Sequence, residues 1–379
     1  MLCSEVTHLV CTNPSSHCRG QTDELPDENI FANVQIGNME AARVASIVEN
    51  YFYTDRSVTR ASRDFLPRPD DVILATNPRT GDKALLRILR LVNARDDEEF
   101  EQVAKTSTSD AVPWIESRFV DGNPDILNAD QPGSRRIFKT HMAAQGLNVK
   151  GKKKCPLFVT IARHPVDVRI SWYNYIRDCY KVGGNDSRIS FEATFSPDDF
   201  VDVTATTAQI NPLAKILTLE HIMIDWYLES KKNKRVFQVF YEQLITSPKV
   251  VIKNLSEFLE AALTPERVER IASILYQEGL IPNPETRERT DTISEFNGMR
   301  FSWFGYQKMV EKWRRALESA QAPADFGKTY EDFYYQATGE KYPFPKVYNP
   351  KPPGKGPLDK IGRDIEGAAK KAASACVIM

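Results

Sequence analysis

The chain has 379 residues, a hydrophobic content of 41% and a formal net charge of −1. This composition supplies a substantial core, and the length fits either one large α/β domain with tails or two domains. Because the charge is nearly balanced, nothing attracts the whole chain to nucleic acid, and any basic site has to be local. The sequence lacks a run of about 18 apolar residues, so we expect no transmembrane helix.

The first 38 residues are predicted to form a disordered tail. The first 20 are rich in Ser, Thr, Asn, Cys and His and contain no continuous apolar segment, unlike a secretory signal. The six cysteines are scattered, which is typical of a reducing compartment rather than of a disulfide framework. Cys3, Cys11 and Cys18 accompany His8 and His17, but their spacing matches no zinc pattern, so we expect no metal here.

Strands alternate with helices along the rest of the chain. The apolar runs that predict strands lie at 72–76, 136–139, 157–162 and 235–240. The segments that predict helices lie at 39–52, 83–93, 98–105, 166–181, 213–231, 244–261, 265–277, 304–319 and 327–337. This alternation predicts an α/β fold in three layers, with a mostly parallel central sheet and helices on both faces. We expect the domain to span residues 39–345.

The first candidate site follows the strand that begins at Val72. A turn containing Pro and Gly occupies residues 77–81, and a helical pattern follows from Lys83 onward. A strand, a tight turn and a helix N-terminus form a cradle of backbone N–H groups that binds anions. Arg79 lies in this turn and supplies a fixed positive charge.

Two further candidate sites also follow predicted strands. Lys139 and His141 lie two residues apart on an extended segment, so they emerge on the same side and can meet one reacting group. Arg163 closes the strand at 157–162, and Ser171 lies eight residues later on the next helix. A guanidinium and a hydroxyl in this arrangement can both bind one phosphate group.

These segments together resemble the cytosolic sulfotransferase family, whose members move a sulfonate group from 3′-phosphoadenosine 5′-phosphosulfate (PAPS). The segments that resemble family motifs, in the family's order, are Thr76 to Ala84, Val112 to Glu116, Lys139 to His141, Arg163 to Ser171 and Phe237 to Leu244. The match extends over roughly residues 70–320. It implies a P-loop-like three-layer fold and PAPS as the co-substrate, with no metal required.

The resemblance also implies roles for individual residues. His141 is expected to be the general base, because an imidazole with an ordinary pKa of about 6.5 can remove a proton near neutral pH. Lys139 and Arg79 are expected to stabilise the sulfonate and the departing oxygen. The residues implied in nucleotide binding are Arg79, Thr80, Gly81, Asp82 and Lys83 at the 5′-phosphate, Arg163 and Ser171 at the 3′-phosphate, Tyr241 near the adenine, and Arg300 in a late basic loop.

The first loop departs from the family pattern at four positions. Arg79 replaces a lysine, Asp82 and Lys83 replace two threonines, and Ala84 replaces a tryptophan that is expected to stack on adenine. Such stacking contributes about 1–3 kcal/mol per base. A carboxylate at position 82 is unfavourable beside a phosphate unless Lys83 or Arg79 neutralises it. Alternatively, Asp82 caps the helix that follows.

Two other functions are considered beside this one. A P-loop kinase would need a glycine where Thr76 stands and Ser or Thr in place of Ala84. A non-catalytic prenylated scaffold would keep the fold with a degenerate donor loop, as Asp82 and Ala84 suggest. The expected acceptor is a small molecule with a hydroxyl or amine, a homodimer is an open possibility, and no nucleic-acid partner is expected.

The last residues form a second motif. Cys376, Val377, Ile378 and Met379 match the prenylation pattern, in which a terminal methionine favours a farnesyl group. A proline- and glycine-rich linker and a basic helical pattern precede them within residues 346–379. Cations beside a prenyl chain strengthen binding to an acidic leaflet. We therefore expect a cytoplasmic protein held on the cytoplasmic face of a membrane by lipidated Cys376.

Overall fold

The computed structural model describes residues 55–106, 112–120, 123–144, 146–147, 156–180, 196–200, 218–283 and 303–344. Several predictions lie outside these ranges and stay predictions. They concern the tail at 1–38, the helix at 39–52, Arg300, the segment 346–379 and Cys376.

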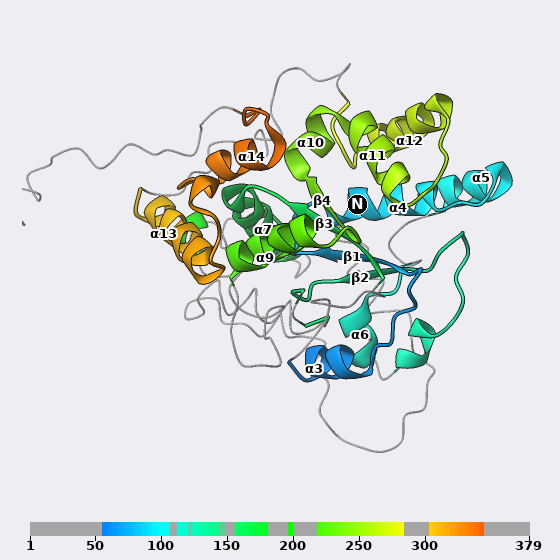
Figure 1. Ribbon diagram of the computed structural model, residues 1–379, viewed down its shortest axis with the longest axis horizontal. Coiled ribbons are helices and arrows are strands. Elements are labelled where there is room, and N and C mark those ends of the chain that lie inside the picture. Colours follow the sequence, from blue (N-terminus) through cyan, green and yellow to red (C-terminus); the bar gives the residue numbers. More distant parts are fainter. Residues whose placement is uncertain are drawn as a thin grey trace, which may run out of the picture.

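A parallel sheet forms the centre of the molecule (Figure 1). Its strands are β1 (Val72–Thr76), β2 (Ile137–Thr140), β3 (Leu157–Ala162) and β4 (Val236–Phe240). They lie in the order β2-β1-β3-β4, and each neighbouring pair is parallel. All four strands were predicted to within one residue at each end. Because the strands are parallel, all four end at the same edge of the sheet.

The strand order places a ligand crevice at one point of that edge. The chain leaves β1 toward β2 on one side and then returns to β3 on the other side. In open parallel sheets ligands bind outside the carboxyl ends of the strands where the connections diverge in this way. The carboxyl ends of β1 and β3 therefore mark the expected site.

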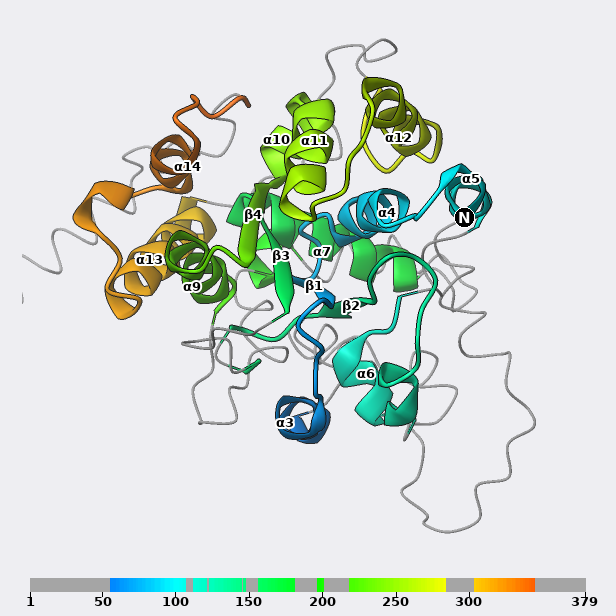
Figure 2. The ribbon, with the colours of Figure 1, turned by 45° about the vertical axis from the view of Figure 1, so that its right-hand side comes forward.

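Helices cover both faces of the sheet (Figure 2). On one face, the inward side chains of β1 and β3 pack against α4 (Asp82–Val92), α11 (Pro248–Phe258) and α12 (Pro265–Gln277). On the other face they pack against α3 (Asp55–Asp64), α6 (Ile115–Val120) and α9 (Leu219–Lys232). The alternation along β1 explains this division, since Val72 and Leu74 face one layer and Ile73 and Ala75 face the other. The predicted three-layer α/β fold is confirmed.

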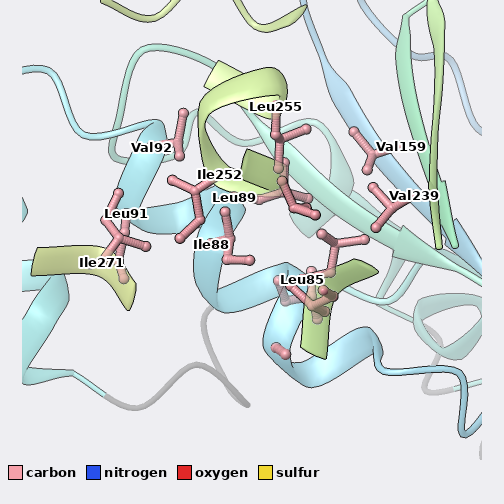
Figure 3. Close-up of a cluster of buried hydrophobic side chains, with 14 of the residues drawn as sticks. Leu85, Ile88, Leu89, Leu91, Val92, Val159, Val239, Ile252, Leu255 and Ile271 are labelled. Atoms are coloured by element: carbon pink, nitrogen blue, oxygen red, sulfur yellow. The ribbon is translucent and has the colours of Figure 1, made fainter. Parts of the chain in front are cut away.

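The first layer contains a dense aliphatic core (Figure 3). Leu85, Ile88 and Leu89 of α4 are fully buried against Ile252 and Leu255 of α11. Their spacing of three and four residues puts them on one side of α4. Fully burying one such side chain stabilises a fold by about 1.5–3 kcal/mol. This packing fixes α4, and with it the position of the turn that precedes it.

A third cluster, rich in aromatic rings, fills the side of the molecule beyond β4. It joins α7 (Pro165–Tyr180), α9, α13 (Trp303–Ser319) and α14 (Tyr330–Thr338). Phe333 lies at its centre, with ring centroids 4.8 Å from Tyr227 and 5.3 Å from Trp313. The remaining elements are α5 (Asp97–Lys105), α10 (Tyr241–Thr246), and the 3₁₀ turns η2 (Pro124–Leu127), η4 (Pro197–Phe200) and η7 (Ala324–Phe326).

Two predicted helices were wrong in extent. The segment 244–261 forms two helices, α10 and α11, because Pro248 begins a new helix and its preceding residue Ser247 takes a non-helical conformation. The helix predicted at 327–337 begins at Tyr330, where Thr329 and Asp332 form a capping box. Gly327 has a φ of 75° and lies outside that helix.

Other helix boundaries follow their caps. Helix α9 begins at Leu219, since the Thr218 side chain accepts the N–H of His221, and residues 213–217 of that prediction lie outside the described ranges. Helix α3 was not predicted, and α6 was recognised only as a motif. Among the ten residues of α3 only Val58 and Ala61 are apolar, and α6 has six residues, so neither segment shows a clear periodic pattern.

Candidate active site

The residues predicted from four separate segments lie at the carboxyl edge of the sheet. The turn after β1 carries Arg79, and His141 follows β2 directly. Arg163 follows β3 directly, and Tyr241 follows β4. The parallel strand register accounts for this convergence.

The turn between β1 and α4 is held in a specific conformation. Thr80 is fully buried, and its Oγ1 donates a 2.6 Å hydrogen bond to the carbonyl oxygen of Asn77. Arg79 and Gly81 both have positive φ, 64° and 106°. A Cβ on Gly81 would lie 2.6 Å from the Tyr241 ring. Glycine is therefore required here both for its backbone conformation and for the close approach of that ring.

Arg79 lies against the helix that follows β3. Its Nε donates a 3.1 Å hydrogen bond to Oγ of Ser171, and its guanidinium carbon lies 4.8 Å from the centre of the Tyr175 ring. The two residues predicted to contact opposite ends of the donor thus touch each other. This contact brings the turn and the middle of α7 together.

Arg163 contacts the same turn. Its Nη1 donates a 3.0 Å hydrogen bond to the carbonyl oxygen of Arg79, and its guanidinium stacks at 4.1 Å on the Tyr241 ring. Arg163 is only 6% exposed, so its charge is poorly screened by solvent. A planar cation that is stacked on a ring and hydrogen-bonded at its edge is well positioned to bind an anion.

His141 is buried directly beside β1. Its Nδ1 lies 2.5 Å from the carbonyl oxygen of Thr76, an acceptor, so Nδ1 carries the ring proton. Its Nε2 therefore carries the lone pair. The backbone N–H of His141 donates a 2.7 Å hydrogen bond to Oε1 of Glu116, which is itself buried. The contact with Thr76 thus fixes the ring and its tautomer, and the contact with Glu116 holds the backbone of His141.

The pKa of His141 differs from the sequence expectation. Burial is the main cause that lowers it, the nearby Lys139 charge adds to the effect, and the pKa falls to about 3. Asp82 and the hydrogen bond to Thr76 act in the opposite direction but are weaker. The expected pKa of about 6.5 was wrong for this site because solvation of the imidazolium is lost. The ring is consequently neutral, the form that a base requires, across the physiological pH range.

Lys139 points to the same side of its strand as His141, as predicted. Its Nζ lies 4.7 Å from the centre of the Trp114 ring. The His141 ring also contacts Trp114, and the centroids of these two rings are 4.9 Å apart. The indole thus holds the predicted base and the predicted cation together. A parallel bridge between Trp114 and Lys139 brings the two segments into register.

Asp82 pairs with Lys139, which corrects two expectations. Its Oδ2 lies 2.6 Å from Nζ of Lys139, so Lys139 is its main partner, and of the two residues expected to neutralise it, Arg79 adds a weaker charge effect. Asp82 does not cap α4 either, because Gly81 is the N-cap and no side chain accepts a hydrogen bond there. Burial is the largest single influence and would raise the pKa of Asp82, but the charge and hydrogen bond of Lys139 together with the charge of Arg79 act against it, and the pKa is held well below its ordinary range.

Two residues of the first loop, Lys83 and Ala84, follow Asp82 in the first turn of α4. Lys83 is exposed at the start of α4, and Ala84 is buried in the core of the first layer. Sequence reasoning assigned no role to Trp114 or Glu116. Their segment, Val112 to Glu116, was recognised only because it resembles a family motif. Within that motif, the tryptophan followed two residues later by a glutamate was the available indication that these two side chains matter.

No group of three or more His, Cys, Asp or Glu residues that could hold a metal occurs in the part of the chain that the structure describes. Within the same part, no helix is both long and apolar enough to cross a membrane.

The sequence of this chain matches the sulfotransferase domain family over residues 69–338. Curated relatives include sulfotransferase 1E1 of Mus musculus, 24% identical over 260 residues, which covers 68% of this chain and 81% of the relative. Cytosolic sulfotransferase 7 of Arabidopsis thaliana is 27% identical over 228 residues, 58% of this chain and 66% of the relative. Sulfotransferase 1E1 of Homo sapiens is 25% identical over 274 residues, 72% of this chain and 87% of the relative.

Similar solved structures include mouse sulfotransferase SULT7A1 complexed with PAP, 18% identical, covering 71% of this chain and 93% of that chain with a TM-score of 0.47. Another is retinol dehydratase in complex with androsterone and inactive cofactor PAP, 15% identical, covering 73% of this chain and 94% of that chain with a TM-score of 0.49. Since the family match covers more than half of the sequence, the chain belongs to the sulfotransferase domain family.

Proposed function

We propose that this protein transfers a sulfonate group from PAPS to a hydroxyl or amine of a small-molecule acceptor. The observation that carries the proposal is the state of His141. Its ring is neutral and buried, Nδ1 is tied to the Thr76 carbonyl oxygen, and Nε2 is left as the basic atom beside Lys139. A positioned base next to a cation is what proton removal from an acceptor requires.

The residues at the crevice fit a donor with two anionic ends. Arg163 and Ser171 lie on one side and would hold the 3′-phosphate. The turn at Arg79 and the first N–H groups of α4 lie on the other and would hold the 5′-phosphate. The hydrogen bond from Arg163 to the Arg79 carbonyl oxygen keeps the two sides close. Tyr241, stacked under Arg163, would lie near the adenine.

The protein's part in the reaction is positioning and charge stabilisation. When bound, the donor supplies the sulfonate, whose bond from sulfur to the 5′-phosphate oxygen breaks as the acceptor oxygen or nitrogen bonds to sulfur. Nε2 of His141 takes the acceptor's proton. Lys139 and Arg79 stabilise the negative charge that remains on the departing oxygen.

Glu116 supports this arrangement from behind the base. Its carboxyl group is 1% exposed and accepts the N–H of His141, and burial raises its pKa to about 7. A carboxyl with this pKa is about half protonated at neutral pH, so it places less negative charge beside the imidazole than an ordinary glutamate would. Glu116 therefore positions the backbone of His141 while adding only part of a negative charge.

The cell compartment and the acceptor are part of the proposal. Curated relatives include proteins named cytosolic sulfotransferases, and we propose that this protein also works in the cytoplasm. We also propose that Cys376 is prenylated and attaches the protein to the cytoplasmic face of a membrane. A C376S variant should incorporate no radiolabelled prenyl group in cells. Equal labelling of C376S and the parent would contradict this part of the proposal.

The test of the main proposal is a transfer assay. The purified protein is incubated with PAPS labelled in the sulfonate and with pools of phenols, alcohols, sterols and amines. We expect label to appear in at least one acceptor pool with the parent and to be lost with H141Q. Undiminished transfer by H141Q would exclude His141 as the base.

A further inference from the structure

Asp82 lies at the N-terminus of α4, where a helix favours negative charge. It is the first residue of α4, and the N–H groups of the first helical turn point toward this end of the helix. Gly81 caps the helix without a side-chain hydrogen bond. A fixed carboxylate at this place is a specific feature of the chain, and capping does not account for it.

The Asp82 carboxylate lies beside cationic side chains from two segments. Lys139 on β2 forms the 2.6 Å ion pair, and the two side chains of this pair are only 17% and 16% exposed. His141 follows on the same segment, and Arg79 approaches from the turn. Glu116 of α6 lies behind His141. Because the pKa of Asp82 is held well below its ordinary range, the carboxylate keeps its charge throughout the neutral and mildly acidic range.

A donor and a product present different charges to such a carboxylate. In PAPS the 5′-phosphate is bonded to the sulfonate and carries one negative charge, while the second charge lies farther out on the sulfonate. In the product, 3′-phosphoadenosine 5′-phosphate, the 5′-phosphate is a monoester with a second pKa of about 6 and a charge of about −1.5 to −2 at pH 7. Repulsion by a nearby fixed anion is therefore stronger for the product.

We propose that Asp82 determines selectivity between donor and product, by weakening the binding of the dianionic 5′-phosphate more than that of the phosphosulfate. This inference rests on the proposed function. Asp82 acts at the 5′ end of the nucleotide, where Lys139 offsets most of its charge while the donor is bound. Once the sulfonate has left, the added charge on the phosphate favours release. Product release limits the turnover of many enzymes, so such a residue would speed the cycle.

The experiment compares nucleotide binding by the parent, D82N and D82T, using calorimetric titration without acceptor. The probes are PAPS and 3′-phosphoadenosine 5′-phosphate at pH 7.5. D82T introduces the hydroxyl that the family carries and provides a second variant should D82N fold poorly. We expect both variants to bind the product about tenfold more tightly than the parent, since one like charge within a few ångströms is removed. Their affinity for PAPS should change by less than about threefold.

A matched control is available at α5. Asp97 is also the first residue of a helix and also forms a 2.6 Å ion pair, with Arg267, but its side chain is 98% exposed. D97N changes the net charge by the same amount and should leave both affinities unchanged. A general effect of net charge would instead appear equally in D97N and D82N.

The pH dependence separates charge repulsion from a structural role of Asp82. At pH 5.5 the product's 5′-phosphate is mostly monoanionic, so the advantage of D82N should fall from about tenfold to about threefold. A constant ratio at both pH values, or weaker product binding by D82N, would overturn the inference while leaving the proposed function intact. Failure of the folded parent to bind either nucleotide would overturn both.

Discussion

Arg163 and Arg79 are joined by a 3.0 Å hydrogen bond from the guanidinium of the first to the carbonyl oxygen of the second. The two residues follow β3 and β1, which are neighbours in the sheet. Arg79 has a φ of 64°, a conformation that non-glycine residues adopt only when their surroundings hold them there. Arg163 therefore supports the backbone of the turn as well as offering its own charge. One residue thus connects the turn after β1 to the end of β3, the two places that we propose bind the anionic ends of the donor.

Replacing Arg163 with lysine should weaken nucleotide binding. R163K keeps the charge but loses both the planar stack on Tyr241 and the fixed hydrogen bond to the turn. We expect the affinity for 3′-phosphoadenosine 5′-phosphate, measured by calorimetry, to fall by at least about tenfold. R267K is a matched control, because Arg267 also stacks on a ring, that of Phe100 at 3.9 Å, and lies on α12. Unchanged affinity in R163K would show that charge alone is sufficient.

Replacing His141 with glutamine should separate chemistry from binding. The glutamine amide cannot take up the acceptor's proton, so the transfer rate should fall by about 10²–10⁴-fold. The nucleotide affinity should stay within about threefold of the parent, since His141 acts on the acceptor. H221Q serves as the control, as His221 is partly buried at the start of α9 and bonds to its own cap, Thr218. A loss of nucleotide affinity equal to the loss of rate would contradict the assignment.

Replacing Gly81 with alanine should destabilise the fold at the turn. The new Cβ would lie 2.6 Å from the Tyr241 ring, and the residue would have to keep a φ of 106°. Backbone strain of this kind costs about 1–3 kcal/mol, and displacement of the ring should add a loss of nucleotide affinity. G279A isolates the backbone part, because Gly279 has a φ of 65° and nothing lies within 4 Å of its added Cβ. Equal thermal stability of G81A and G279A would contradict the steric argument.

Glu242 should make stability depend on pH. It is fully buried, its Oε1 accepts the N–H of His164, and its Oε2 accepts the Tyr330 hydroxyl at 3.1 Å. Burial raises its pKa from 4.5 to about 7. The folded state therefore favours the protonated acid, and this contribution to stability is complete below pH 4.5 and disappears as the pH rises through about 7.

The E242Q variant should remove this dependence, because its side chain stays neutral. Relative to the parent, its free energy of unfolding should increase between pH 5 and pH 8 by up to on the order of 3 kcal/mol. Denaturant titration at several pH values measures this difference. E257Q, at an exposed glutamate of α11, should show no such change. A difference between E242Q and the parent that does not vary with pH would refute the argument.

Much of the fold could be predicted because its strands are short, fully buried apolar runs. Every residue of β1 and of β3 is buried, and such runs read clearly in a sequence. Helices were harder wherever a single residue decides a boundary. Pro248 divides one amphipathic pattern into two helices, and the Thr329 cap sets the start of α14. These local interactions outweigh the periodic pattern on which the predictions depended.

The sequence could predict which residues gather at the site, because that depends on their positions after the strands, but not how their side chains pair. Arg79, His141 and Arg163 each follow a strand end, so a parallel sheet had to bring them together. The pairing of Asp82 with Lys139 was not predictable, because it depends on how a side chain at the start of α4 meets one on β2. The pKa of His141 near 3 was not predictable either, since it results mainly from burial that the sequence does not show.

The most direct test of the account is a calorimetric titration of the parent with 3′-phosphoadenosine 5′-phosphate and, separately, with ATP and magnesium. The account predicts saturable binding of the first nucleotide at one site per chain, lost in R163A, and no comparable binding of ATP. Tight binding of ATP with magnesium in preference to the bisphosphate would contradict it, and so would a folded protein that binds neither nucleotide.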